Sequence, residues 1–226
     1  SRGIMHPSLE APSDERPGVS AYSARRASGT YDAAVDLWWL LVPASYLLGG
    51  FPTAHLIGRF TGTDPLAEGS GNPGASNMYR VAGRRAGATV LIGDVLKGLI
   101  PTALGYLADG RPLATACGIA AMVGHVAPML RGFRGGKGVS TLGGACILLH
   151  PIVSLCVVAI WALVMRTFRV ASVGSLVMAL LLPVGVALRG RPGWEVAAMA
   201  GAAAVIFVRH WSNIVRLVRN EERALS

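Results

Sequence analysis

The sequence is poor in charge. Asp, Glu, Lys and Arg make up only 15% of its 226 residues, whereas an average soluble domain has about 25%. Apolar residues make up 52% of the chain, and the mean hydropathy is +0.49. So few charges cannot cover the surface of a soluble protein of this size, and lipid is the natural solvent for most of that surface. The composition therefore predicts an all-α integral membrane protein.

The sequence also lacks short motifs that mark common hydrolytic sites. It contains neither a GxSxG elbow nor an HExxH pair. Its three cysteines, Cys117, Cys146 and Cys156, lie in apolar segments without the paired spacing of a metal site, and we interpret them as packing residues. We expect no metal and no cofactor, so any catalysis has to come from positioning and electrostatics.

Basic residues are in excess, with a formal net charge of +9, but they do not form a basic domain. They lie at the ends of apolar runs, as they do in membrane proteins. We therefore expect no nucleic acid partner and expect membrane lipid around the protein. We also expect a monomer.

Residues 1–35 differ from the rest of the chain. They are rich in Ser, Pro and charged residues and show little apolar periodicity, a composition typical of disorder. No charged start is followed by a short apolar core and a small-residue cleavage site, so we expect no cleaved signal peptide. The predicted organisation is a disordered tail over 1–35 and one membrane-embedded domain over 36–226.

Apolar segments bounded by charged and turn residues follow the tail. They run over roughly 37–57, 86–107, 113–130, 138–149, 151–165, 171–188 and 194–208. The fourth and fifth are shorter than the ~20 residues of a full crossing. The pattern still predicts about seven transmembrane helices, and no internal repeat is visible.

The cations of the connecting loops predict the orientation, because cytoplasmic loops carry an excess of Lys and Arg. The loops after the first, third and fifth segments, with the C-terminal end, carry thirteen, whereas the opposite loops carry only Arg111, Arg189 and Arg191. We therefore expect a cytoplasmic C-terminus and an N-terminus outside. Four polar stretches then share the cytoplasmic face: 68–80, 131–141, 166–175 and 209–222. We expect them to form one site.

The loop EGSGNPGASNMYR, 68–80, is unusually polar for a connection between two membrane spans. It offers neutral hydrogen-bonding side chains and, in Arg80, a forked donor suited to phosphate. Its glycines permit close approach of the backbone to a ligand. A simple inter-helix turn is the alternative, but such turns are shorter and carry fewer donors. We therefore expect this loop to line a site for a polar, anionic ligand.

The second loop contains GFRGGKG, 132–138, directly before an apolar segment. Glycines let backbone N–H groups turn toward an anion, and the helix N-terminus that follows attracts negative charge. Arg131, Arg134 and Lys137 add positive charge. The stretch is not a Walker loop, because Gly138 stands where Ser or Thr is required. A flexible loop with ordinary cytoplasmic cations is the alternative, and we favour a phosphate cradle.

Three polar residues within the apolar segments admit two interpretations. Asp94 and Lys97 lie three residues apart on one helical face, and they either neutralise each other or orient the site. His125, near the inner end of the third segment, is either a hydrogen-bonded structural residue or a base.

The C-terminal stretch, 209–222, adds further candidates. His210 and Asn213 are one helical turn apart and share a face, and Glu222 lies beyond them. The stretch is amphipathic, so we expect Arg216 and Arg219 to meet lipid headgroups.

Together these motifs resemble the acyl-phosphate:glycerol-3-phosphate acyltransferase family of bacterial membranes (PlsY). The similar stretches, in the family's order, are YLLGGFP, GSGNPGASNMYR, GDVLKG, GHVAPMLRGFRGGKGVST and RHWSNIVRLVRNEE. The resemblance implies a seven-span enzyme of the bacterial inner membrane with a cytoplasmic active site. It implies transfer of a fatty acyl group from acyl phosphate to the 1-hydroxyl of sn-glycerol 3-phosphate. The implied products are lysophosphatidic acid and phosphate, for phospholipid synthesis.

The resemblance and the loop chemistry together give the candidate site. The candidate catalytic residues are Ser70, Arg80, Lys137, His210 and Asn213. The candidate substrate-binding residues are Gly69, Gly71, Asn72, Ser76, Asn77, His125, Gly135, Gly136, Gly138, Ser172, Ser175 and Glu222. Ser172 and Ser175 are alternatives for one serine of the family, and Asn220 stands where the family commonly has glycine.

An organic-phosphate transporter or channel is the alternative function, because it too would use glycines, cations and broken helices. Transporters usually place the site near the membrane midplane between repeats, whereas these motifs gather at one face. For the enzyme, acyl phosphate is already activated, so no covalent acyl-enzyme is required. A phosphate oxygen of the substrate is the expected proton acceptor, with His210 as the alternative base.

Overall fold

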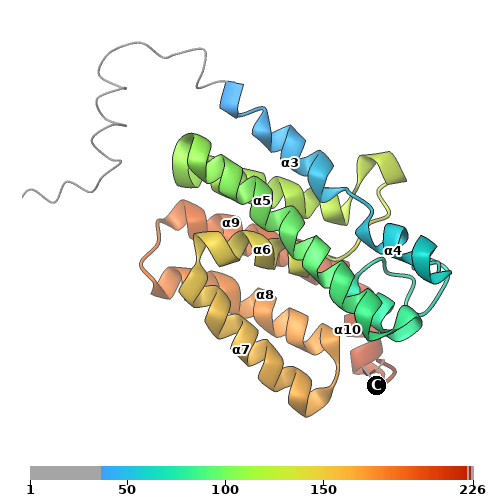
Figure 1. The fold of residues 1–226 in the computed structure, drawn as a ribbon. Coiled ribbons are helices and arrows are strands. Elements are labelled where there is room, and N and C mark those ends of the chain that lie inside the picture. Colours follow the sequence, from blue (N-terminus) through green and yellow to red (C-terminus); the bar gives the residue numbers. More distant parts are fainter. Residues whose placement is uncertain (1–36, 223, 225–226) are drawn as a thin grey trace, which may run out of the picture. The chain divides into compact units, whose positions relative to one another are not determined.

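The computed structural model describes residues 37–222 and residue 224. The unit that starts at Trp38 is a bundle of α-helices, and within these described ranges no β-strand occurs. Figure 1 shows long helices packed lengthwise, with the turns between them gathered at two ends of the bundle. The disordered tail predicted for 1–35 lies outside the described residues.

The order of elements follows the apolar segments of the sequence. In chain order they are α3 (Leu41–Gly49), α4 (Thr53–Thr61), α5 (Ala75–Val126), the 3₁₀ helix η1 (Met129–Arg131), α6 (Val139–Leu149), α7 (Pro151–Phe168), α8 (Ala171–Leu188), α9 (Gly193–Arg209) and α10 (Trp211–Val218). The last four predicted segments correspond to α6, α7, α8 and α9, and α8 has the predicted bounds.

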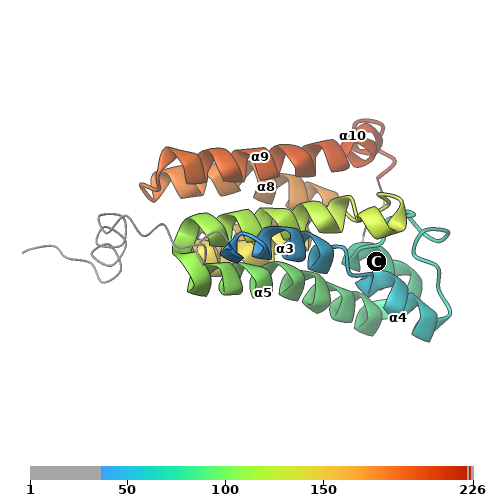
Figure 2. The ribbon, with the colours of Figure 1, turned by 90° about the horizontal axis from the view of Figure 1, so that it is seen from above.

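The element α5 is two helices that fold back on each other. Asp109 (φ −149°) and Gly110 (φ +67°) are non-helical, and the chain reverses there, as Figure 2 shows. We call residues 84–108 the first arm of α5 and residues 111–126 the second arm. Gly83 (φ +88°) separates the first arm from a short helical stretch before it. The two arms correspond to the second and third predicted segments.

The first predicted segment, 37–57, is not one helix, so that prediction is wrong. Helix α3 ends at Gly49, and α4 begins at Thr53. Pro52 lies between them, with φ −83° and ψ 58°, and its missing N–H cannot continue a helical ladder. Hydropathy does not register such a break because both sides of it are apolar.

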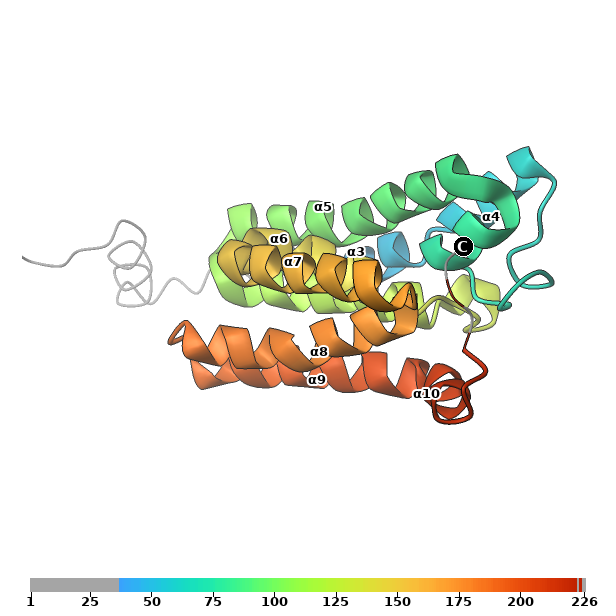
Figure 3. The ribbon, with the colours of Figure 1, turned by 90° about the horizontal axis from the view of Figure 1, so that it is seen from below.

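Small residues allow the helices around α5 to pack closely. A Cβ on Gly98 would lie 1.8 Å from the Thr141 carbonyl oxygen, and one on Gly144 would lie 2.0 Å from the Val95 carbonyl oxygen. The first arm and α6 therefore touch backbone to backbone, as helices in lipid commonly do. Helix α3 packs on α5, while α7 packs on α8 and α8 on α9. Figure 3 shows α8 and α9 as a layer beside the one that contains α5 and α6.

The described helices include segments that can cross a membrane. By length and composition these are Ala75–Arg131, Pro151–Phe168 and Ala171–Leu188, and a fourth results if α9 and α10, bent by 59°, count as one span. Large apolar side chains cover the outside of the bundle, including Leu107 (81% exposed) and Leu155 (72% exposed). Such a surface is costly in water and suits lipid.

A buried ion pair joins three helices at the end of the bundle where α5 reverses, which we call the far end. Arg111 donates from Nε to Glu195 Oε1 at 2.8 Å and from Nη2 to Glu195 Oε2 at 2.6 Å. The same Nη2 donates to the carbonyl oxygen of Leu149 at 3.1 Å. Glu195 is buried, and His150 Nε2 lies 3.7 Å from its Oε2 atom. The opposite end, with α4, α10 and the long loops, is called the loop end.

Candidate active site

A cavity of about 740 Å³ opens at the loop end and runs into the bundle. At the loop end its walls are polar and come from the 68–80 loop, the glycine loop and the residues around α10. Farther in, its walls are apolar and come from the first arm of α5 and from α6, α7 and α8. A hollow with one charged and one apolar end fits a ligand that has the same two parts.

Asn77 holds the 68–80 loop in place from inside the protein. Its Oδ1 accepts from the Ser70 backbone N–H at 2.7 Å and from the Ser70 hydroxyl at 3.0 Å. Its Nδ2 donates to the carbonyl oxygens of Pro65 at 3.1 Å and Glu68 at 3.0 Å. Arg80 Nη2 in turn donates to Ser70 Oγ at 3.4 Å. With its hydrogen-bonding atoms engaged, Asn77 positions Ser70 and Arg80 at the cavity wall.

The glycine loop enters the bundle beside His125. The Gly136 N–H donates to the His125 carbonyl oxygen at 3.0 Å, and Arg209 donates to the carbonyl oxygens of Gly135 at 3.0 Å and Gly136 at 3.3 Å. A Cβ on Gly136 would lie 2.1 Å from His125 Nε2, so a larger residue does not fit there. Fixed on both sides, the loop carries Lys137 to the cavity.

A chain of charged hydrogen bonds crosses the polar end of the cavity. Lys137 Nζ donates to Asn213 Oδ1 at 2.5 Å, and Asn213 Nδ2 donates to Glu222 Oε1 at 2.5 Å. The Ser172 hydroxyl also donates to Glu222 Oε1, at 3.0 Å, and Arg216 Nε donates to Glu222 Oε2 at 2.7 Å. The network joins the glycine loop, α8, α10 and the segment after α10.

Among the described residues, cations outnumber carboxylates around the polar end of the cavity. Burial lowers the pKa of Lys137 to about 8; Glu222 opposes this shift, while Arg216, Arg80 and Arg209 add to it. Burial alone would raise the pKa of Glu222, but hydrogen bonds from Asn213, Arg216 and Ser172 outweigh it and lower the pKa. Glu222 is thus ionised at neutral pH, and several cations surround this one carboxylate. The surplus positive charge suits a bound anion.

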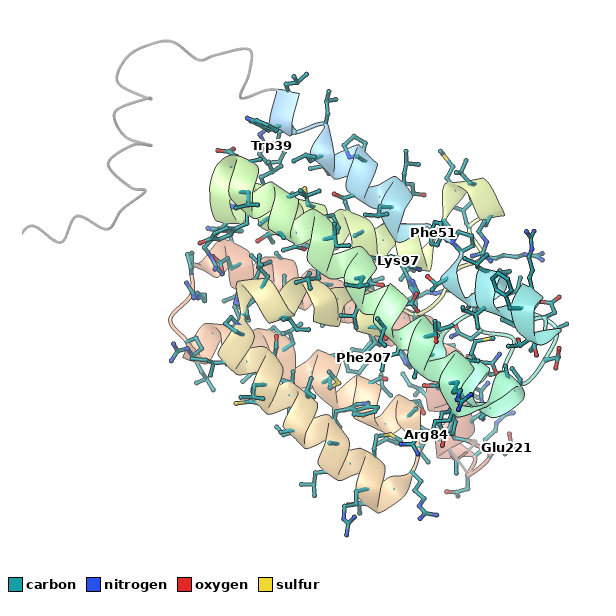
Figure 4. The ribbon with its side chains drawn as sticks, viewed as in Figure 1. Trp39, Phe51, Arg84, Lys97, Phe207 and Glu221 are labelled. Atoms are coloured by element: carbon teal, nitrogen blue, oxygen red, sulfur yellow. The ribbon has the colours of Figure 1, made fainter. Side chains whose placement is uncertain are left out.

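Two histidines border the cavity in different surroundings. His210 is buried, and its Nδ1 lies 2.8 Å from the Ile206 carbonyl oxygen. A carbonyl only accepts, so Nδ1 carries the proton and Nε2 is left as the acceptor. His125 lies over the ion pair of Lys97 and Asp94, with Nζ and Oδ1 2.8 Å apart. Figure 4 places Lys97 within the bundle, where the pair neutralises its charge. His125 Nδ1 lies 3.5 Å from Lys97 Nζ and 3.7 Å from Asp94 Oδ1, so the pair also contacts a side chain of the cavity wall, and both interpretations stand.

The structure brings most candidate residues to one hollow. Those that line the cavity are Ser70, Asn72, Ser76, Asn77, Arg80, His125, Lys137, Gly138, Ser172, Ser175, His210, Asn213 and Glu222. Ser172 bonds to Glu222, whereas the Ser175 hydroxyl donates to the Ala171 carbonyl oxygen at 2.9 Å.

Four glycines act in the loops and do not line this cavity. Gly69 (φ +63°) and Gly71 (φ +68°) adopt left-handed backbone that shapes the 68–80 loop. Gly135 and Gly136 are buried against the His125 region.

Arg216 was assigned wrongly from the sequence. It does not simply meet headgroups, because it pairs with Glu222 and lines the cavity. The sequence contained the signal: His210, Asn213 and Arg216 recur every three residues and so share a helical face. The apolar wall, with Trp161 and Met178 among its residues, was also not singled out, because apolar side chains are expected throughout a membrane protein.

The apolar part of the cavity reaches the side of the bundle. Leu91 on the first arm of α5, Ile147 on α6 and Val158 on α7 all line it, and they are 44%, 48% and 49% exposed. These half-exposed residues mark a side opening toward the surroundings of the helices. As for metals, no group of three or more His, Cys, Asp or Glu side chains in residues 37–222 and 224 is arranged to hold one.

The fold and the cavity define a helical membrane protein whose main hollow has a cationic end and an apolar end. Residues 39–220 match the family model described as glycerol-3-phosphate acyltransferase, and the chain belongs to that family.

Named relatives and solved structures agree with this assignment. A glycerol-3-phosphate acyltransferase of Trichlorobacter lovleyi is 39% identical, over 82% of this chain and 95% of the relative. One of Thioalkalivibrio sulfidiphilus is 42% identical, over 80% of this chain and 91% of the relative. The crystal structure of PlsY, an integral membrane glycerol 3-phosphate acyltransferase in its glycerol 3-phosphate form, superposes with a TM-score of 0.80 at 32% identity. The match covers 83% of this chain and 94% of that one.

Proposed function

We propose that this enzyme transfers a fatty acyl group from acyl phosphate to the 1-hydroxyl of sn-glycerol 3-phosphate. The products are lysophosphatidic acid and inorganic phosphate, in phospholipid synthesis. The observation that carries the proposal is a single cavity whose cationic end, with Arg80, Lys137 and Arg216, continues into an apolar chamber. Both substrates carry phosphate, and one also carries a long chain, so such a cavity can hold them together. PlsY structures in glycerol 3-phosphate and lysophosphatidic acid forms support the choice of acceptor and product.

We infer the residue roles from the geometry. Arg80 and the Ser70 hydroxyl, 3.4 Å apart, hold the phosphate of the acceptor, since a guanidinium binds phosphate through a forked pair of donors. Lys137 and the N–H groups of the glycine loop at the start of α6 stabilise charge on the phosphate that leaves. Asn213 and Glu222 hold Lys137 in position through the two 2.5 Å hydrogen bonds.

The reaction is a direct acyl transfer. The 1-hydroxyl oxygen attacks the carbonyl carbon of acyl phosphate, a C–O bond forms, and the bond to phosphate breaks with its electron pair. The hydroxyl proton passes to a phosphate oxygen of the substrate. Glu222 is a poor base, because three donors hold its oxygens. His210 Nε2 is the alternative acceptor, and a His210→Ala enzyme that binds substrate normally but has lost turnover would establish it instead.

The topology completes the proposal. We infer seven crossings formed by α3, the two arms of α5, α6, α7, α8 and α9, in one monomeric domain from about residue 36. The thirteen loop and C-terminal cations against three on the other side put the loop end in the cytoplasm and the N-terminus outside. The membrane is then the bacterial inner membrane, where glycerol 3-phosphate reaches the cavity from the cytosol.

The test is phosphate release by purified protein in detergent or vesicles. With acyl phosphate and glycerol 3-phosphate together, we expect phosphate and lysophosphatidic acid to form in equal amounts. Omission of either substrate should stop both. If labelled glycerol 3-phosphate instead enters sealed vesicles and no new lipid forms, the protein is a transporter and the proposal is wrong.

A further inference from the structure

The apolar chamber has a closed inner end. Along α6, the residues that line it stop at Cys146 and Ile147; along α7 they begin at Ser154, and along α8 they stop at Leu182. From Val139 to Ile147, α6 rises about 12 Å at about 1.5 Å per residue. The chamber therefore extends about that far from the phosphate end before the helices close it.

Tight packing closes this end. Directly beyond Ser154 and Leu182, a Cβ on Gly185 would lie 2.7 Å from Val153 Cγ1, so α7 and α8 leave no space between them. Val153 and Val186 belong to the buried core there. One turn before Ser154 lies His150, which borders the buried Arg111–Glu195 pair of the far end. An apolar chain that ran past Ser154 would have to displace core side chains and then meet buried charge.

Ser154 is the hydroxyl-bearing residue at the closed end of the chamber, where it lies with Cys146, Ile147 and Leu182. It is 5% exposed and lines the cavity, and among the described residues its hydroxyl has no hydrogen-bond partner. A buried hydroxyl without a partner is unfavourable, and neither the phosphate network nor the helix uses it. Additional methylenes of an acyl chain placed against this hydroxyl would gain little binding free energy, because a hydroxyl is solvated better by water than by hydrocarbon.

We propose that Ser154 sets the length of the acyl chain that this enzyme prefers. The terminal methyl group of the donor lies against Ser154, Cys146 and Leu182, the donor's phosphate lies at Lys137, and the chamber between them measures the chain. An acyl chain that fills the chamber gains dispersion contacts with its apolar walls. This inference rests on the proposed function, since it assigns the apolar chamber to the acyl group of the donor.

The test compares turnover over a series of saturated acyl phosphates from decanoyl to stearoyl. Ser154→Leu shortens the chamber, so the best donor should become shorter, and the preference for lauroyl over decanoyl, which differ by two methylenes near the closed end, should fall by about tenfold. Ser154→Ala removes the hydroxyl without adding volume, so turnover of the longest donors should rise relative to the rest. If the leucine variant fails to fold, Ser154→Val shortens the chamber by less and carries the same comparison.

The neighbouring residue supplies a control. Leu155 is 72% exposed on the outside of α7, and Leu155→Ala should leave the chain-length profile as in the wild type. Profiles of all Ser154 variants that match the wild type, with full turnover, would mean that the chain leaves through the side opening, and would overturn the inference alone. A wild-type protein that acylates glycerol 3-phosphate with none of the donors would overturn the proposed function, and this inference with it.

Discussion

The two ends of the bundle both contain buried charge, but they use it differently. At the far end, Arg111 makes two hydrogen bonds to Glu195 and one to the Leu149 carbonyl oxygen. One cation meets one anion, and the Glu195 carboxylate is buried while the Arg111 side chain is 25% exposed. At the loop end, Lys137, Arg80 and Arg216 lie around a cavity with Glu222 as their ionised partner. Figure 4 shows Arg84 and Glu221 near the same end.

The difference separates structural charge from functional charge. Breaking a balanced, enclosed pair leaves a buried ion, so the pair matters mainly for folding. Cations that outnumber the carboxylates around a cavity create a positive potential there and can bind an anionic ligand, so they matter mainly for activity. The Asp94–Lys97 pair is balanced like the far end although Asp94 borders the cavity. Four predictions test the contrast, taken here from the largest expected effect to the smallest.

Arg111→Met should produce the largest loss of stability. It leaves the Glu195 carboxylate, which is 1% exposed, without its partner, at a cost of about 3–5 kcal/mol. We expect a lower Tm in detergent and less folded protein, with the activity of each folded molecule retained. The double variant Arg111→Met/Glu195→Gln should recover much of the stability. A stable Arg111→Met enzyme with little activity would contradict the assignment of a structural role to the far-end pair.

Lys137→Ala should produce the opposite result. Losing one preorganised cation at the departing phosphate should lower kcat by about 10²- to 10³-fold, while the Tm stays close to that of the wild type. The measurement is steady-state phosphate release together with thermal unfolding. Near-normal turnover in this variant would refute the phosphate cradle.

The charge on Lys137 also predicts a pH profile. Burial lowers its pKa to about 8, and the protonated form is the active one, so kcat/KM should be level below that pH. Above it, kcat/KM should fall by about tenfold per pH unit. In Lys137→Arg the side chain keeps its proton, so the alkaline fall should disappear even if the overall rate is lower. The same fall in both enzymes would mean that another group is responsible.

The smallest effect should come from Asn220, which turns the chain after α10 so that Glu222 enters the network. Its φ of +57° is left-handed, a region that Asn and Gly tolerate and β-branched residues avoid. Asn220→Val should cost about 1–2 kcal/mol in this turn and lower kcat by up to about tenfold. Asn220→Gly should stay within about twofold of the wild type. Equal activity of the two variants would show that this turn does not position Glu222.

Much of the architecture could be predicted from apolar runs and the polar residues between them. Helix α8 has the predicted bounds, and α6, α7 and α9 lie within a few residues of theirs, because charge and Pro delimit lipid-facing helices strongly. The polar motifs also identified nearly all of the cavity's polar wall. Glycines, cations and a helix N-terminus that are adjacent in sequence are also adjacent in space, so an anion-binding wall could be predicted from the local pattern.

Other features depended on three-dimensional packing and could not be predicted. The break between α3 and α4 lies within one apolar run, so hydropathy did not separate its two sides. Asn77 was expected to bind ligand, yet its hydrogen bonds go to the protein and position Ser70. Arg216 points into the cavity because it pairs with Glu222. This contact depends on how the segment after α10 folds back and not on the local sequence pattern. The closed chamber behind Ser154 likewise exists only once α6, α7 and α8 have packed.

The side opening at Leu91, Ile147 and Val158 also bears on how the enzyme should be assayed. A donor that enters there comes from the bilayer, where its effective concentration is its mole fraction among the lipids and not its amount per litre. Diluting the membrane with inert lipid or detergent would then slow the donor's arrival, although the bulk amounts stay the same. The same dilution would not change the concentration of the water-soluble acceptor. The reaction rate would therefore depend on the mole fraction of the donor in the membrane but on the bulk concentration of the acceptor.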